Sequence, residues 1–119
     1  MKTRKLGCLV VSEIGMGCMG FSHGYGQIPA AEYSIEAIQK AHTFGCTFFD
    51  TAEAYGPNLE PQNRGHNEKI VGKALRNVRK DVVLATKLHL PTEEVRADGD
   101  VYLTLRRHLE ASMDRLQTD

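Results

Sequence analysis

The chain has 119 residues, which is enough for one modest domain. Its 15 basic and 15 acidic side chains cancel, so a nucleic-acid or membrane-surface partner attracted by charge is not expected. A hydrophobic content of 41% is typical of a globular protein and argues against a disordered chain.

The cysteines and the N-terminus indicate the compartment. Cys8, Cys18 and Cys46 are widely separated without a paired spacing, so no disulfide framework is expected and a reduced setting is the default. The basic residues 1–5 are not followed by an apolar stretch long enough for a signal core. No window approaches the roughly 20 apolar residues that span a membrane. We therefore expect a cytoplasmic location and no membrane partner.

The N-terminal half of the chain alternates between strand and helix patterns. Residues 3–12 predict a β-hairpin, and residues 14–17 predict a short strand that leaves into a glycine-rich loop. A helix is predicted from Pro29, which suits a first helical position, to a stop at Gly45. Its apolar face recurs at helical spacing and contains Ile35, Ile38, Ala41 and Phe44. Residues 46–50 predict the next strand.

The C-terminal half continues the alternation. Asn67 is predicted to cap a second helix, with Glu68 in its favourable first turn. Residues 82–87 predict a strand, residues 89–99 predict a loop, and Asp100 is predicted to cap a third helix. The inner face of that helix is expected to contain Val101, Leu105, Leu109, Ser112, Met113 and Leu116. This order predicts a right-handed parallel α/β domain.

Two apparent motifs carry little weight. Gly15, Gly17 and Gly20 match the G-x-G-x-x-G dinucleotide-binding pattern, but no helix is expected to open at the last glycine, as that pattern requires. A tight strand exit that lets a ligand approach the backbone is the preferred interpretation. The five histidines are scattered without a metal-ligand spacing, so no metal site is expected.

Two predicted strands end in opposite charges, Asp50 and Lys87. An unpaired buried charge is unfavourable, and active sites of parallel α/β domains lie where the strands end, so we expect the two side chains to meet. Tyr55 follows five residues after Asp50 and completes a predicted acid–base centre. A nearby ammonium favours the ionised form of a tyrosine and so tunes it as a proton donor. Residue types and spacing leave open the alternative of a structural Asp–Lys ion pair beside a loop tyrosine.

Several segments, taken in order, resemble the aldo-keto reductases. The most specific is Phe-Phe-Asp-Thr-Ala-Glu-Ala-Tyr-Gly at residues 48–56; the others are residues 3–7, 11–22, 67–68 and 85–87. The resemblance covers essentially the whole chain. It implies the N-terminal part of a TIM-type (β/α)₈ barrel, in which a β-hairpin is followed by three βα units. It also implies reduction of an aldehyde or ketone with NADP(H), so residues 1–119 would be an incomplete reductase barrel domain.

The resemblance also implies roles for individual residues. Asp50, Tyr55 and Lys87 match the catalytic Asp, Tyr and Lys of the family. The implied cofactor-binding positions are Gly17, Cys18, Met19 and Asp50. Tyr55 would protonate the carbonyl oxygen as a general acid, with Lys87 tuning it and Asp50 holding Lys87.

The chain departs from the family pattern after Asp119. The fourth catalytic residue of the family is a histidine on the fourth strand, and the cofactor phosphates are held by later strands still. A full barrel needs about 250 residues. We therefore expect the 119-residue chain alone to be inactive, and its exposed sheet face and edges to cause self-association. The alternative hypothesis is a catalytically silent α/β module that folds by pairing with itself or with the rest of the barrel.

Overall fold

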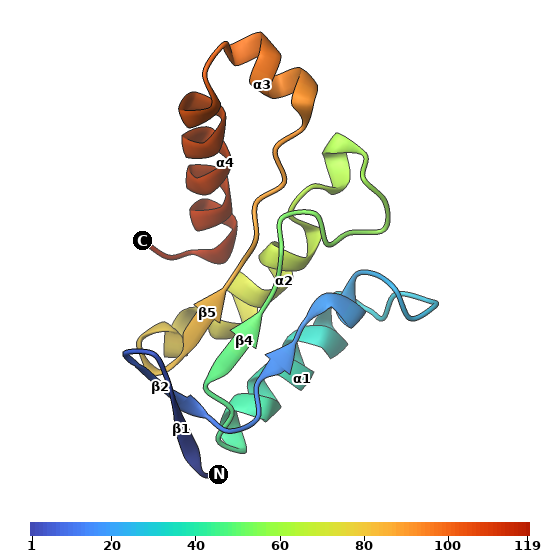
Figure 1. The fold of residues 1–119 in the computed structure, drawn as a ribbon. Coiled ribbons are helices and arrows are strands. Elements are labelled where there is room, and N and C mark those ends of the chain that lie inside the picture. Colours follow the sequence, from blue (N-terminus) through green and yellow to red (C-terminus); the bar gives the residue numbers. More distant parts are fainter.

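The computed structural model describes residues 1–119 and contains two small sheets. Strands β1 (Thr3–Leu6) and β2 (Leu9–Ser12) form the predicted antiparallel hairpin. The second sheet is parallel and has the order β3 (Met16–Gly17), β4 (Phe48–Asp50) and β5 (Val83–Ala85). All of these parallel strands fall inside the predicted ranges but are shorter. Figure 1 shows the hairpin near the end of the sheet where β4 and β5 begin.

Reciprocal hydrogen bonds attach the hairpin to the sheet. The backbone N–H of Ser12 donates to the Thr47 hydroxyl at 2.8 Å, and the backbone N–H of Thr47 donates to the Ser12 hydroxyl at 2.9 Å. Ser12 ends β2 and Thr47 directly precedes β4. These contacts fix the hairpin at the amino-terminal ends of the strands, away from the carboxyl ends where the charged residues lie.

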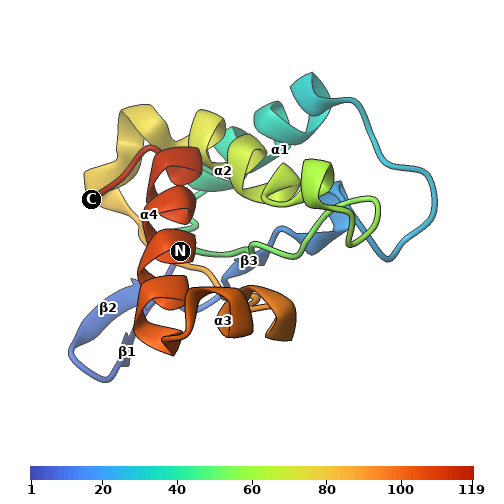
Figure 2. The same ribbon diagram turned by 90° about the horizontal axis from the view of Figure 1, so that it is seen from above.

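The helices lie mainly on one side of the parallel sheet. They are α1 (Ala31–Thr43), α2 (His66–Leu75), α3 (Thr92–Asp98) and α4 (Val101–Leu116), with 3₁₀ turns at Met19–Phe21, Pro61–Asn63 and Arg76–Asp81. Figures 1 and 2 show α1 and α2 side by side along one face of the sheet, with the last turn of α4 against α2. None of these helices combines the length and the apolar character that crossing a bilayer requires.

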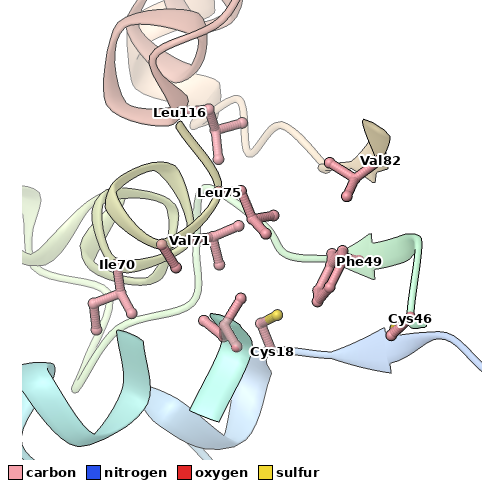
Figure 3. Close-up of a cluster of buried hydrophobic side chains, with 10 residues drawn as sticks. Cys18, Cys46, Phe49, Ile70, Val71, Leu75, Val82 and Leu116 are labelled. Carbon is pink, nitrogen blue, oxygen red and sulfur yellow. The ribbon is translucent and has the colours of Figure 1, made fainter. Parts of the chain in front are cut away.

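The hydrophobic core fills the space between the sheet and the helices. Its buried members are Cys18, Ile38, Cys46, Phe49, Ile70, Val71, Ala74, Leu75, Val82 and Leu116. Figure 3 shows Cys18, Val71 and Leu75 grouped beside the strand that carries Phe49, with Leu116 from α4 above Leu75. Successive side chains of a strand point to opposite faces. Because Phe49 is fully buried toward the helices, Asp50 projects from the opposite face of β4.

Three local predictions were wrong. The first helix begins at Ala31, two residues after the predicted Pro29. Asn67 does not cap α2, because the cap position is Gly65 in a left-handed conformation (φ 74°) and the Asn67 side chain is buried elsewhere. Residues 89–99 are not only loop, because α3 forms there, with Pro91 immediately before its first residue. Pro91 is the N-cap of this helix, a position that tolerates proline because no intrahelical N–H bond is made there.

The inner face of α4 also differs from the prediction. Asp100 caps the helix as predicted, and its carboxylate accepts a hydrogen bond from the backbone N–H of Tyr102 at 2.8 Å. Ser112 and Leu116 are buried as predicted, but the other buried side chains are Thr104 and His108, whereas Val101, Leu105 and Leu109 are exposed. The buried polar side chains all have hydrogen-bond partners, which removes the penalty for their burial.

A glycine permits the close approach of α4 to α2. A Cβ atom placed on Gly72 would lie 2.8 Å from the Leu116 Cα and closer still to the Arg115 carbonyl oxygen. Only a residue without a side chain fits between these two backbones. The contact places the last turn of α4 directly against α2.

Candidate active site

The structure brings Asp50 and Lys87 together, as predicted. Residues Asp50 and Ala85 are paired in the parallel register of β4 and β5, and Lys87 follows two residues later. The ammonium of Lys87 donates to both carboxylate oxygens of Asp50 at 2.8 Å and to the carbonyl oxygen of Thr51 at 2.8 Å. These contacts occupy the three N–H donors of the ammonium and fix its position.

Tyr55 lies beside this ion pair. The Lys87 Nζ atom is 5.0 Å from the centroid of the half-buried Tyr55 ring. The backbone of Tyr55 is anchored, since its N–H donates to the Ala52 carbonyl at 3.2 Å and its carbonyl accepts from the Asn67 N–H at 3.0 Å. The three predicted catalytic side chains therefore lie close together, at the carboxyl ends of β4 and β5.

The electrostatics of the site keep Lys87 charged. Burial disfavours the ammonium, but interactions with Asp50 and then with Tyr55 outweigh that effect, and the pKa of Lys87 is raised. At neutral pH the tyrosine therefore has a fixed positive charge next to it. A positive charge of this kind favours negative charge developing on a phenolic oxygen.

The Asp50–Lys87 ion pair is too exposed to be explained well as a purely structural feature. The side chains of Asp50 and Lys87 are 43% and 50% exposed. Ion pairs with this degree of exposure typically contribute only about 0–1 kcal/mol to stability. The pair therefore adds little to the stability of the fold, which argues against a purely structural role. Orienting the ammonium beside Tyr55, by contrast, does not require that the pair be deeply buried.

The predicted cofactor-binding residues differ in accessibility. Gly17 is exposed, and a Cβ atom placed on it would meet no heavy atom within 4 Å, while Met19 is half-buried. The Cys18 side chain is fully buried, and burial, followed by the charges of Asp50 and Cys46, raises the pKa of its thiol to about 12. Its backbone N–H donates to the Asp50 carbonyl at 2.8 Å. A ligand at this edge of the sheet can therefore reach Gly17, Met19 and Asp50, whereas the Cys18 thiol is buried in the core and out of its reach.

Sequence reasoning missed a buried amide that joins the loops of the site. The side chain of Asn67 accepts from the Thr51 hydroxyl at 2.6 Å and donates to the Cys18 carbonyl and the Ser22 hydroxyl, both at 2.8 Å. It thereby links the loops after β3 and β4 to the start of α2. The polar type of the residue was visible in the sequence, but its partners 16 to 49 positions away were not.

A second missed feature is a group of buried ionisable side chains, here called the buried ion cluster: Glu53, Glu68, His108 and Arg115. Glu53, Glu68 and His108 are almost completely inaccessible, and Arg115 is mostly buried. Glu53 contacts His108 at 2.7 Å and Arg115 at 3.1 Å, and Glu68 contacts Arg115 at 2.7 Å. Buried charges persist only where each finds partners. The signal in the sequence was Glu53, an acid located between Asp50 and Tyr55.

Glu94 borders the buried ion cluster and should make stability depend on pH. Hydrogen bonds from His108 first, and then from Arg107 and Arg64, lower the pKa of Glu94 from 4.5 to about 2. Because the folded-state pKa is the lower one, the stabilisation is complete above pH 4.5 and is lost as the pH falls toward 2. Glu94→Gln should therefore lower the free energy of unfolding by about 1–3 kcal/mol at pH 6, and by progressively less below pH 4.5.

Urea unfolding of the parent chain and the Glu94→Gln variant at several pH values between 3 and 6 measures this difference. Glu93→Gln is the matched control, because Glu93 is an exposed neighbour in the same helix turn. A Glu94→Gln effect that stays the same at pH 3 and pH 6 would contradict the assignment of an ionised, paired Glu94.

Comparison with known proteins identifies the family. The Aldo/keto reductase family profile matches residues 13–119. Aldo-keto reductase str7 of Strobilurus tenacellus is 34% identical over 126 residues, which cover 100% of this chain and 34% of that protein. The aldo-keto reductase yakc [NADP(+)] of Schizosaccharomyces pombe is 34% identical over 98% of this chain and 34% of its own length. The chain thus spans about a third of the length of these curated relatives.

Solved structures agree with the sequence comparison. The aldo-keto reductase AKR11C1 from Bacillus halodurans, in its holo form, superposes with a TM-score of 0.75 and 32% identity, over 100% of this chain and 37% of that one. A putative aldo-keto reductase from Pseudomonas aeruginosa gives a TM-score of 0.73 and 29% identity, over 98% of this chain and 43% of that one. The hairpin and three βα units are therefore the N-terminal part of a TIM-type (β/α)₈ barrel, and the chain belongs to the aldo-keto reductase family.

Proposed function

We propose that residues 1–119 supply Asp50, Tyr55 and Lys87 to an NADP(H)-dependent oxidoreductase that reduces an aldehyde or ketone to an alcohol. The observation that carries this proposal is the ammonium of Lys87, held by both Asp50 oxygens at 2.8 Å and located 5.0 Å from the Tyr55 ring centroid. Family membership supports carbonyl chemistry in general. The name of the Schizosaccharomyces pombe relative, which includes NADP(+), supports the choice of cofactor.

The residues at the carboxyl edge of the sheet fit the nicotinamide end of such a cofactor. The open space around Gly17 leaves room for a flat ring against the backbone, and Met19 and Asp50 are accessible beside it. When bound, the cofactor supplies a hydride to the carbonyl carbon. Tyr55 donates its phenolic proton to the carbonyl oxygen as a general acid. Lys87 stabilises the negative charge that develops on Tyr55, and Asp50 holds the ammonium in position.

The chain on its own should neither reduce carbonyls nor remain a compact monomer. Lys87, at the carboxyl edge of the sheet, is already paired with Asp50 and so is not free to hold the cofactor phosphates. Val101, Leu105 and Leu109 leave an apolar surface on α4, and β3 and β5 are open edges of the sheet. Such surfaces favour self-association.

We expect no measurable NADPH-dependent reduction of an aldehyde by the purified chain, and a gel-filtration volume that corresponds to oligomers. The double variant Leu105→Gln/Leu109→Gln should shift the protein toward the monomer, since it removes apolar surface without disturbing a core contact. A compact, monomeric parent chain that turns over an aldehyde would contradict this part of the proposal.

The proposed chemistry itself is tested in a completed barrel. The completed barrel is a chimera that joins residues 1–119 to the part of the Bacillus halodurans reductase that follows its matched segment. This joining is reasonable because the two chains superpose over the whole of residues 1–119. We expect the completed barrel to oxidise NADPH in the presence of an aldehyde. A folded chimera that binds NADPH but does not reduce any aldehyde in a panel would count against the proposal.

A further inference from the structure

We propose that Glu53 is a positioning residue, which fixes the segment carrying Lys87 against the loop carrying Asp50 and Tyr55. It would do so by binding the backbone on both sides of Leu88 while α4 holds its carboxylate. The inference rests on the proposed function, because it assigns Glu53 a part in placing the ammonium beside Tyr55.

Glu53 contacts the Lys87 segment through both its backbone and its side chain. The backbone N–H of Glu53 donates to the Lys87 carbonyl at 2.9 Å. One carboxylate oxygen, Oε1, accepts the backbone N–H of His89 at 3.0 Å. The residue itself is fully buried and lies between Asp50 and Tyr55 in sequence. One residue of the Asp50–Tyr55 loop therefore holds the peptide groups on either side of the residue after Lys87.

Two residues of α4 hold the Glu53 carboxylate. His108 Nδ1 lies 2.7 Å from Oε1, and Arg115 donates from Nη2 to Oε2 at 3.1 Å. Both residues belong to α4, whose last turn is pressed against α2 at Gly72. The carboxylate cannot rotate without breaking contacts on both oxygens, so its Oε1 remains directed at His89.

The buried ion cluster also contacts the Lys87 segment at Thr86, the residue before Lys87. Arg115 donates from Nε to Glu68 Oε2 at 2.7 Å, and Glu68 Oε1 accepts from the Thr86 hydroxyl at 2.6 Å. Thr86 directly precedes Lys87. The buried ion cluster thus contacts residues 86, 87 and 89, and of its two acids only Glu53 also belongs to the loop that carries Tyr55.

The chemistry of a carboxylate suits this role better than that of an amide. Glu53 accepts three hydrogen bonds through its two oxygens. In Glu53→Gln one of these oxygens becomes an NH₂ group, which cannot accept a hydrogen bond and would face another donor. The variant still leaves His108 paired with Glu94 and Arg115 paired with Glu68, so the remaining buried charges keep partners.

Trace acylation of lysines in the 119-residue chain tests the inference without any turnover. The chain is labelled with a limiting amount of acetic anhydride across a pH series, and the labelling of Lys87 is read by peptide mass spectrometry relative to exposed Lys40. Only an uncharged amine reacts, so the pH dependence reports how firmly the ammonium is held by Asp50 and Tyr55, the titratable groups that face it. Glu53→Gln is expected to increase Lys87 labelling near pH 9 by about 3- to 10-fold.

Glu94→Gln is the matched control. It removes the carboxylate at the other nitrogen of His108, 2.6 Å from Nε2, but does not touch the Lys87 segment. Labelling of Lys87 should stay within about twofold of the parent chain in this variant. If Glu94→Gln raises Lys87 labelling as much as Glu53→Gln does, the cluster merely anchors α4 and the inference is overturned.

A second variant, Glu53→Asp, distinguishes loss of the contact with His89 from loss of folding. Glu53→Asp keeps the buried charge but shortens the reach to His89 by one methylene group, so Lys87 labelling should again rise while that of Lys40 stays constant. Unchanged Lys87 labelling in folded Glu53→Asp and Glu53→Gln chains, with folding checked by circular dichroism, would overturn the inference. Because the assay involves no aldehyde or ketone substrate and no cofactor, a positive result together with an inactive completed barrel would reject the proposed function alone.

Discussion

Replacing Tyr55 with phenylalanine in the completed barrel should lower kcat/KM for an aldehyde by about 100-fold or more. The change keeps the ring that packs beside the Lys87 ammonium but removes the phenolic proton donor placed there. General acid catalysis typically contributes a factor of about 10² to 10⁴. The affinity for NADPH, measured by cofactor fluorescence, should change little because the phenolic proton is used in the chemical step.

Tyr33→Phe is the control for this substitution. Tyr33 is an exposed tyrosine in the first turn of α1 and takes no part in the contacts among Asp50, Tyr55 and Lys87. That variant should retain the parent rate. A Tyr55→Phe barrel with near-parent turnover would show that another group donates the proton.

Replacing Lys87 with methionine in the completed barrel should have the second large effect. Without the ammonium, the negative charge that develops on the Tyr55 oxygen during proton transfer is less well stabilised, so kcat should fall by about tenfold or more. The variant also leaves the Asp50 carboxylate without its partner.

Stability distinguishes catalytic from structural roles for Lys87. Because Asp50 and Lys87 are 43% and 50% exposed, the unfolding free energy of the chain should fall by only about 1 kcal/mol or less. Lys40→Met, at an exposed position of α1, serves as the control for loss of a lysine. Normal activity in Lys87→Met, accompanied by a large loss of stability, would favour the structural ion pair.

Local patterns predicted the features of the fold that depend on neighbours in sequence. Alternating or continuous apolar runs located every parallel strand, and helical spacing located α1, α2 and α4. The meeting of Asp50 and Lys87 was also predictable, because parallel strands place their carboxyl ends at one edge. The short helix α3 was missed, because its seven residues are too few to show an apolar period.

The features that escaped prediction depend on contacts between distant residues. His108 and Arg115 are buried because Glu53 lies 55 and 62 positions earlier in the chain and accepts hydrogen bonds from both. A pattern of apolar spacing assigns these polar positions to the solvent. It therefore placed Val101, Leu105 and Leu109 on the inner face of α4, although it predicted Ser112 and Leu116 correctly. Asn67 was misassigned for the same reason, since a cap is a local role and its actual partners include Cys18 and Ser22.

Transfer of deuterium from cofactor to product tests the central claim most directly. The completed barrel is given an aldehyde and NADPH that carries deuterium at the transferable position, and the alcohol is analysed by mass spectrometry. The account predicts an alcohol with one deuterium on the carbinol carbon, formed by the parent barrel and Tyr33→Phe but about 100-fold more slowly by Tyr55→Phe. A folded barrel that binds the cofactor yet gives no labelled alcohol, or one whose Tyr55→Phe form labels the product at the parent rate, would contradict it.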